Sequence, residues 1–165
     1  AKHEGEYVLM SGNQSAAVYL EYILSQLQAQ GKLPSNAVMY NTIVTSDLGE
    51  LVARHYGVDV EKTLTGFKFI GDKIRKYEKT GEKQFIFGYE ESYGCVVKDF
   101  VRDKDGVQAV ITAAECGNYY KKQGKDLIDV LMIYMLDMVH SKKAKSLSLK
   151  LVQLVMQELK KSCLT

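Results

Sequence analysis

The spacing of apolar residues near the start of the chain predicts a short strand followed by a helix. Residues 7–10 form an apolar run that ends at a turn, and Asn13 in this turn can cap a helix. Apolar residues then recur at helical spacing over 16–27, and Gly31 ends the segment. We therefore expect one face of this helix to be buried.

The next stretch repeats the same order of elements. Residues 37–44 are rich in β-forming residues and predict a buried strand. Asp47 and Glu50 then have the spacing of a capping box, which predicts a short helix that ends near Gly57. A strand followed by a helix, twice over, predicts an α/β layer.

The middle of the chain continues this alternation. Residues 58–64 predict a further strand, although two charged residues interrupt it. The helix that follows carries one apolar stripe, which consists of Phe67, Ile70, Ile74 and Tyr77. Residues 84–87 predict the next strand, and the run 95–101 can return beside it as a hairpin.

The last part of the chain predicts helices. A helix after Gly106 is expected to turn its apolar residues inward, namely Val107, Val110, Ile111 and Ala114. Residues 127–138 predict another helix, whose methionines are typical of core packing. A short alternating stretch and an amphipathic helix over 147–159 finish the chain.

The composition is that of a soluble globular protein with one domain. The 165 residues are 46% hydrophobic and 25% charged, and the net charge is +2. From Ser141 onward, however, six lysines accompany a single glutamate, whereas the first 140 residues carry 16 basic and 19 acidic side chains. This basic end has no arginine and no aromatic residue, so we expect a solvated helix face and no nucleic-acid partner.

The cysteines and the hydropathy of the sequence indicate in which cellular compartment the protein is expected. Cys95, Cys116 and Cys163 are odd in number and widely spaced, so neither a zinc site nor a disulfide framework is indicated. A reducing cytoplasm is the simplest interpretation. The sequence has no run of about 20 apolar residues, and we therefore expect no membrane insertion.

The most distinctive stretch is residues 87–94, with the sequence FGYEESYG. It places Glu90, Glu91 and Ser92 between two glycines, directly after an apolar strand. A carboxylate can accept hydrogen bonds from two neighbouring hydroxyls, and a serine can both donate and accept, so the set suits a polyol or sugar. An ordinary polar turn with solvated acids is an equal alternative. Because adjacent residues on an extended chain point to opposite faces, the two glutamates are not expected to act as an acid/base pair.

A second segment carries groups that suit a ligand. Thr65 and Gly66 precede a helix whose first backbone N–H groups have no partner within the helix, and Lys68 lies in its first turn. This arrangement suits an anionic or hydroxylated ligand. A solvent-facing Lys68 without any ligand is the alternative.

Lys104 lies between Asp103 and Asp105, and two acids would hold its ammonium group charged at the start of a helix. The same acids do not complete a calcium loop, because the third acidic position and the terminal glutamate are missing. The sequence also shows no serine, histidine and aspartate constellation and no GxxxxGK phosphate loop. We therefore predict no catalytic residue and no metal ligand in this chain.

Four motifs occur in order along the chain, namely Gly12-Asn13-Gln14, TGFKFIG at 65–71, GYEESYG at 88–94 and RDKDG at 102–106. Together they resemble the third domain of the α-D-phosphohexomutases, closest to the bacterial phosphoglucomutase and phosphomannomutase type. The resemblance covers residues 5–150. It implies an α/β fold, with a small mixed β-sheet flanked by helices and a C-terminal helical extension.

The resemblance also implies a domain organisation. Residues 1–140 would form the sugar-binding domain, and 141–165 would be a linker strand and helix that lead toward a C-terminal phosphate-binding domain. The chain begins without methionine and looks like a piece of a longer protein. Near Leu151 the sequence departs from the family pattern. The last fifteen residues are therefore expected to differ most in fold from the family.

As the resemblance implies it, the parent enzyme interconverts hexose 1-phosphate and hexose 6-phosphate. The reaction proceeds through a phosphoserine and a bisphosphorylated intermediate, glucose 1,6-bisphosphate in the case of glucose. Magnesium would be held outside this chain, and the fragment alone would bind the hexose without catalysis. Leu64 stands where many phosphomannomutases have a lysine, which favours glucose over mannose.

Site residues are implied by position in the motifs. Glu90 and Ser92 match the loop residues that bond sugar hydroxyls, Lys104 matches a lysine that reaches the substrate, and Thr65 with Gly66 matches the other wall of the pocket.

Beside this loop, Glu91 is expected to be structural and to pair with Arg102 or Lys104. The expected partners of the chain are a hexose phosphate and the other domains of the parent enzyme, and exposed interfaces could drive self-association. Two alternatives remain open: a free-standing module that senses a sugar phosphate, and a protein-interaction domain.

Overall fold

The computed structural model describes residues 1–140, which form two compact units. The first, which we call the sheet unit, is Ser11–Cys116. The second, which we call the terminal unit, combines Ala1–Met10 with the chain from Gly117 onward. The linker strand and helix predicted for 141–165 lie outside the described residues, and the predicted domain boundary at 140 stays a prediction.

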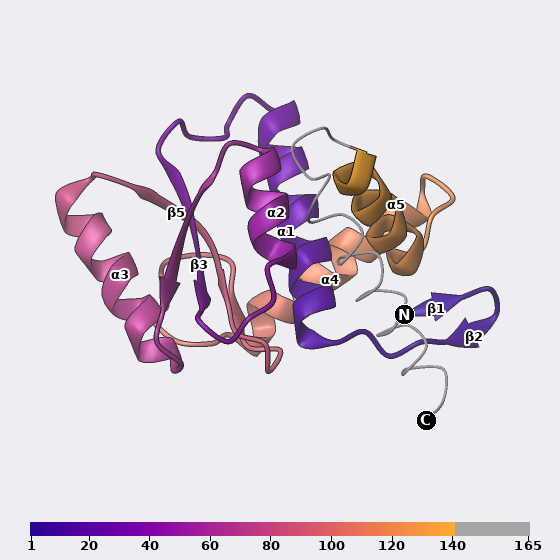
Figure 1. Cartoon of the computed structure of the whole chain (residues 1–165), viewed down its shortest axis with the longest axis horizontal. Helices are drawn as coiled ribbons and strands as arrows, with labels where there is room; N and C mark the ends of the chain where they lie inside the picture. Colours follow the sequence, from indigo (N-terminus) through magenta and orange to yellow (C-terminus); the bar gives the residue numbers. More distant parts are fainter. Residues whose placement is uncertain (141–165) are drawn as a thin grey trace. The chain divides into compact units, whose positions relative to one another are not determined.

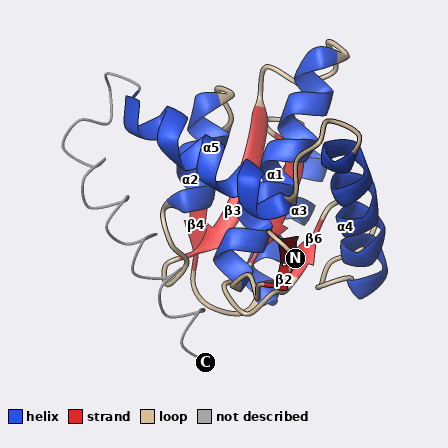
Figure 2. Cartoon of the chain, turned by 90° about the vertical axis from the view of Figure 1, so that its right-hand side faces the viewer, coloured by secondary structure: helices blue, strands red, loops and turns tan. Residues whose placement is uncertain are grey.

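The sheet unit is built on four strands in the order β4-β3-β5-β6. These are β3 (Ala37–Thr42), β4 (Asp59–Thr63), β5 (Gln84–Tyr89) and β6 (Cys95–Val96). Strand β3 pairs in parallel with β4 and β5, whereas β5 and β6 are antiparallel. In Figure 2 the labels β4, β3 and β6 follow this order across the sheet. The predicted small mixed sheet is confirmed.

Strand β3 lies at the centre of this architecture. All six of its residues are buried, because neighbours pair with both of its edges and helices cover both faces. Figure 1 shows α3 (Phe67–Thr80) on one side of the sheet and α1 (Gly12–Ala29) with α2 (Leu48–His55) on the other. The predicted α/β layer is therefore confirmed.

The predicted apolar stripe of α3 is also confirmed. It packs against the sheet in one core cluster, whose members are Phe67, Ile70, Ile74, Tyr77, Val38, Tyr40 and Val96. Burial of one such side chain contributes about 1.5–3 kcal/mol relative to leaving it exposed. This cluster fixes the position of the first turn of α3.

Of the two predicted helix caps, Asn13 is wrong, whereas Asp47 occupies the N-cap position of α2 without the predicted side-chain hydrogen bond. Ser11, not Asn13, caps α1: its hydroxyl accepts from the Gln14 N–H at 3.3 Å, and the Gln14 side chain accepts from the Ser11 N–H at 2.8 Å. At α2, the Asp47 side chain makes no capping hydrogen bond. It lies instead 3.4 Å from the ammonium group of Lys62, which competes successfully for the carboxylate.

The orientation predicted for α4 (Gly106–Lys121) is wrong as well. Val107 and Val110 are each 70% exposed, and Ile111 and Ala114 also face outward. The inward face instead carries two polar residues, Gln108 and Thr112, and Cys116.

The physical reason lies in the Gln108 amide. Its Oε1 accepts from the N–H groups of Val97 at 2.9 Å and Lys98 at 2.7 Å. These two backbone donors follow the short strand β6, and satisfying them in the interior outweighs burial of valine side chains on the other face.

The terminal unit contains a two-stranded hairpin and a helix. Strand β1 (Lys2–His3) pairs with β2 (Glu6–Tyr7), so the strand predicted over 7–10 is wrong beyond its first residue. Of the apolar residues of that run, Tyr7 and Leu9 are exposed, whereas Met10 is buried. The helix predicted over 127–138 is confirmed as α5 (Leu127–His140). Within residues 1–140, no helix combines the length and hydropathy that crossing a membrane requires.

A charged cluster joins strand β4 to the following helix. Glu61 accepts from the Lys73 ammonium at 2.7 Å, from the Tyr77 hydroxyl at 2.8 Å, and lies 3.0 Å from the Lys83 ammonium. Burial by itself would raise the pKa of Glu61, but these three donors outweigh it and lower the pKa to about 2. The carboxylate therefore stabilises the fold in its charged form.

We predict that Glu61→Gln lowers the free energy of unfolding by roughly 2 kcal/mol at pH 7. Because the folded-state pKa lies below the unfolded one, this contribution is complete above pH 4.5 and is lost as the pH falls toward 2. Urea unfolding followed by circular dichroism at pH 7 and pH 2.5 measures the difference. The exposed Glu115→Gln is the matched control, and an equal loss at both pH values would contradict the assignment.

Candidate functional site

Three parallel strands end at the same edge of the sheet, and their loops meet there. Residues 64–66 follow β4, residues 90–94 follow β5, and Thr42 ends β3, which lies between them. The strand order reverses around β3, because the chain places β4 on one side of it and β5 on the other. The crevice at the carboxyl ends of such strands is where α/β folds bind ligands.

Glu90 connects the loops after β4 and β5. Its Oε1 accepts a hydrogen bond from the Gly66 N–H at 3.0 Å, and its Oε2 lies 3.9 Å from the Lys104 ammonium. The Glu90 side chain is only 11% exposed, whereas that of Lys104 is 46% exposed. The structure thus brings together three of the predicted site residues and holds the carboxylate in one orientation.

Lys104 has a defined position as well. Its ammonium lies 3.0 Å from Asp103 Oδ1 and 5.3 Å from the centre of the Phe67 ring. Hydrogen bonds from Lys104 lower the pKa of the Asp103 carboxyl. The predicted second acid is wrong, because Asp105 caps α4 by accepting from its first N–H groups. Glu90 is the second acid near the lysine.

The loop that carries Glu90 is closed on itself. The Glu90 N–H donates to the Gly94 carbonyl at 2.8 Å, and Tyr93 adopts a left-handed backbone with φ of 68°. A left-handed non-glycine residue is uncommon and marks local strain that the surroundings must hold in place. Ser92, the other predicted sugar-bonding residue of this loop, is exposed at its tip.

Glu91 turns away from Glu90, as expected for adjacent residues, but its predicted pairing is wrong. Its Oε2 accepts from the Thr42 hydroxyl at 3.2 Å, which ties the loop to the end of β3. Arg102, one of the predicted partners, donates instead to Glu78 at 2.6 Å. The contact between Glu91 and Thr42 depends on how the strands align in the sheet. Residue spacing along the sequence does not predict this alignment.

Thr65 and Lys68 lie at the start of α3. Thr65 is exposed immediately before the helix, and the Lys68 ammonium lies 4.9 Å from the centre of the Phe69 ring. Lys68 and Lys104 line the same groove of about 690 Å³, together with Gly71, Asp72, Arg75, Val101, Arg102, Asp103 and Asp105. The two predicted lysines therefore line one groove, and Lys104 is the one that approaches Glu90.

Two glycines that residue chemistry alone does not single out shape the site. A Cβ at Gly12, in the first turn of α1, would overlap the Glu91 carbonyl oxygen and lie 2.8 Å from the Tyr93 nitrogen. A Cβ at Gly94 would overlap the Cδ atom of Lys104. Because Gly12 has no side chain, α1 can pack directly against the loop. Because Gly94 has none, the Lys104 side chain can pass over Gly94. Their only sequence signal is their place within the motifs.

The site does not contain a group of metal-ligating side chains. In the described part of the chain, one cluster of three His, Cys, Asp or Glu residues has its ligand atoms close enough to hold an ion, and it comprises His3, Asp126 and Asp129 of the terminal unit. Glu90 accepts from one backbone N–H and lies beside the positive charge of Lys104, which suits recognition of hydroxyl groups better than binding of a cation.

We predict that Gly12→Ala destabilises the protein by about 1–3 kcal/mol, because the added methyl group overlaps backbone atoms that cannot rotate away. Urea unfolding measures this loss, and amide NMR shifts over 90–94 report the displaced loop. Gly117→Ala is the matched control: this helical glycine has open space around it, so the change is neutral or stabilising by up to about 1 kcal/mol. Equal behaviour of the two variants would refute the support role of Gly12.

Over residues 11–136 the sequence matches the family described as phosphoglucomutase/phosphomannomutase, alpha/beta/alpha domain III. A phosphoglucomutase of Staphylococcus epidermidis is 39% identical over 128 residues, which cover 78% of this chain and 22% of the relative. A phosphoglucomutase of Staphylococcus haemolyticus is 35% identical over 127 residues, which cover 77% of this chain and 22% of the relative.

The fold is also similar to a solved structure, the open form of pp63/parafusin, a phosphoglucomutase from Paramecium. The TM-score is 0.58 at 23% identity, and the match covers 76% of this chain and 20% of that chain. The chain thus spans about a fifth of the length of the relatives it matches. Since the family match extends over most of the chain, including every motif around Glu90, this chain belongs to the phosphoglucomutase/phosphomannomutase family and corresponds to its alpha/beta/alpha domain III.

Proposed function

We propose that this chain is the sugar-recognition domain of a phosphohexomutase, an enzyme that interconverts hexose 1-phosphate and hexose 6-phosphate. The observation that carries this proposal is the Glu90 carboxylate. One of its oxygens is held by the Gly66 N–H, and the other is directed toward the ammonium of Lys104, a residue that lines a groove. Such a group is oriented in advance, so a ligand does not have to meet the entropic cost of fixing it.

The proposed contacts follow from donor and acceptor chemistry. A charged carboxylate only accepts, so Glu90 takes hydrogen bonds from two adjacent ring hydroxyls. The Lys104 ammonium only donates and is matched to an oxygen of the sugar or its phosphate. Ser92 can do either, from the exposed tip of the loop. In this proposal Thr65 and Gly66 form the other wall of the sugar site, and Lys68 lines the groove together with Lys104.

This arrangement suits an intermediate that must turn over within the enzyme. In a hexose bisphosphate, turning exchanges the two phosphates and approximately exchanges the adjacent hydroxyls between them. A carboxylate that bridges those hydroxyls can therefore hold either orientation with the same two hydrogen bonds. Glu90 would serve both half-reactions without moving, consistent with its fixed bond to Gly66.

We assign no catalytic residue to this chain. Phosphoryl transfer relies on a positioned nucleophile and a metal ion that stabilises the developing charge, and removing both removes essentially all of the rate. The phosphoserine and the magnesium ion belong, in this proposal, to other parts of the parent enzyme, and the fragment alone is inactive. Glucose is favoured over mannose by Leu64 and by the names of the relatives.

The outer face of α4 supports a role within a larger assembly. Val107, Val110 and Ile111 form an exposed apolar strip on this helix. An apolar strip on a helix is typical of a contact surface, here proposed for other domains of the parent enzyme, with self-association of the isolated chain as a consequence. The cytoplasmic location stays a prediction that agrees with the free, buried Cys95 and Cys116.

We predict that glucose 1,6-bisphosphate shifts the amide NMR signals of Gly66, Glu90, Ser92 and Lys104 in a saturable way. Glu90→Gln keeps an acceptor for the Gly66 N–H but loses the charge, so the dissociation constant should rise by roughly tenfold or more. Glu91→Gln is the matched control, because glutamine still accepts from Thr42, and its binding should equal that of the unchanged chain.

The possible outcomes separate the rival functions. A protein-interaction domain with an inactive loop predicts no sugar response and no effect of Glu90→Gln. A free-standing sensor predicts tight binding by the chain alone, whereas a domain of an enzyme predicts weak binding. Shifts of similar size in both glutamate variants would place the sugar elsewhere.

We further predict that Gly94→Ala weakens bisphosphate binding by roughly tenfold, because the added methyl group pushes the Lys104 chain away from Glu90. Gly94 does not have a positive φ, so backbone strain does not explain such a loss. In a Lys104→Ala background the colliding Cγ and Cδ atoms are absent, and Gly94→Ala should then have no further effect. A loss that persists in this background would mean that the loop itself is deformed.

A further inference from the structure

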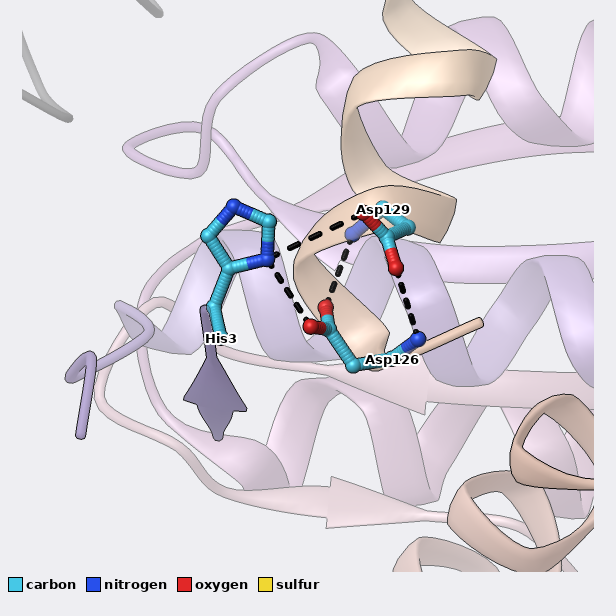
Figure 3. Close-up of side chains that lie close together, drawn as sticks. All are labelled: His3, Asp126 and Asp129. Atoms are coloured by element: carbon cyan, nitrogen blue, oxygen red, sulfur yellow. Dashed lines mark hydrogen bonds and ion pairs between the residues drawn. The ribbon is translucent and has the colours of Figure 1, made fainter. Parts of the chain in front are cut away.

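A second cluster of chemically active side chains lies in the terminal unit, which contains none of the four family motifs. His3 on β1 approaches Asp126, which directly precedes α5, and Asp129 in the first turn of α5, as Figure 3 shows. Its Nδ1 lies 2.8 Å from Asp126 Oδ2 and 3.8 Å from Asp129 Oδ1. All three side chains are partly exposed, so solvent and ions reach them.

In each of the two aspartates, one carboxylate oxygen caps the helix and the other faces His3. Asp126 Oδ1 accepts from the N–H groups of Ile128 at 2.8 Å and Asp129 at 3.0 Å, and Asp129 Oδ2 accepts from the Asp126 N–H at 2.9 Å. These bonds form a reciprocal cap of α5 and fix both carboxylates. Each carboxylate then has its other oxygen directed toward His3 (Figure 3).

The separations of these atoms suit a single cation. The three ligand atoms all lie within 4.8 Å of one another. Zinc binds imidazole nitrogen and carboxylate oxygen at about 2.0–2.2 Å in tetrahedral geometry, which places its ligands about 3.3 Å apart. The separations of 2.8 Å and 3.8 Å lie on either side of this value, so small side-chain rotations are sufficient.

Charge and ligand type also agree with a divalent transition metal ion. Two carboxylates and a neutral imidazole carry a charge of −2, which outweighs the partial positive charge of the helix N-terminus. One nitrogen and two oxygen ligands suit zinc and its neighbours better than calcium, which prefers oxygen alone and more ligands. Hydrogen bonds that fix ligating carboxylates, as the cap of α5 does here, are usual around metal sites.

We propose that His3 Nδ1, Asp126 Oδ2 and Asp129 Oδ1 form a binding site for one divalent transition cation, with Zn²⁺ as the preferred ion. The cation would join the β1–β2 hairpin to the start of α5 and leave a fourth position for water. This site is independent of the proposed sugar recognition, because none of its residues belongs to the sheet unit. Its failure would leave the function proposed for Glu90 unaffected.

Protons compete with the cation for this site. The hydrogen bond to Asp126 raises the pKa of His3, so the metal ion must displace a proton from the ring. Neighbouring acids that also raise this pKa are Asp129 and Glu4.

The test uses the complete 165-residue chain without a histidine tag and with Cys163→Ser, because a thiolate would bind zinc by itself. Zn²⁺ is titrated against a chromophoric chelator, and Co²⁺ absorption reports the geometry. We expect one equivalent to bind and to raise the unfolding temperature. Long-range ¹H–¹⁵N NMR should show that Nδ1 of His3 is the ring nitrogen that changes.

The variants separate a ligand role from a structural one. Asp126→Asn keeps a good helix cap, since asparagine caps as well as aspartate, but loses a charged ligand. This variant, Asp129→Asn and His3→Gln should each weaken Zn²⁺ binding by more than about tenfold. His55→Gln, a change at a histidine of the sheet unit, should leave it unchanged.

Three results would overturn the proposal. They are no binding at one equivalent of Zn²⁺, binding that all three site variants leave intact, and coordination through Nε2 of His3. A loss of helix α5 in a variant without metal would be seen by circular dichroism, and Asp126→Asn, which retains the cap, then remains the decisive comparison.

Discussion

The hydrogen bond between the Glu90 carboxylate and the Gly66 N–H is the contact on which the candidate site depends. It connects loops that follow β5 and β4, two strands that are not neighbours, so it reaches across the end of β3. The sheet sets this distance, because parallel pairing on both sides of β3 brings the two strand ends level. A buried carboxylate needs a donor, and here a helix-initiating N–H satisfies that need while leaving one oxygen available.

The other residues of the site pack closely around the loop that carries Glu90. Glu91 anchors the same loop to Thr42, α1 approaches it where Gly12 has no side chain, and Lys104 passes over Gly94. Each feature removes freedom from the loop before any ligand arrives. The left-handed backbone of Tyr93 is therefore held from several directions, which is the condition under which such strain persists.

The sequence was informative where one interaction dominates. The apolar stripe of α3 and the buried strand β3 were predictable because burial of apolar residues decides them. The face of α4 was not, because one glutamine that satisfies two backbone N–H groups outweighs three exposed apolar side chains. Helical periodicity identifies an apolar face but does not reveal a backbone donor elsewhere in the chain that needs a partner.

The same limit applies to polar side chains whose partners lie far along the chain. Asp47 had the right spacing for a cap, yet its carboxylate makes no capping hydrogen bond and lies 3.4 Å from the Lys62 ammonium. Likewise, the hydrogen bond between His3 and Asp126 joins residues that are 123 positions apart, which residue spacing does not predict. The motifs located Glu90 and Lys104, whereas their mutual geometry required the fold.

The position of β3 between β4 and β5 has a consequence for synthesis of the protein. A ribosome makes β3 and β4 first, and they can pair at once. The other edge of β3 then has no partner until residues 84–89 have been made, and an unpaired apolar strand edge is a site for association with other chains. A nascent chain that contains β3 and β4 but not yet β5 would therefore depend on chaperones. Chains that end before β3, or that already include β5, would depend on them less.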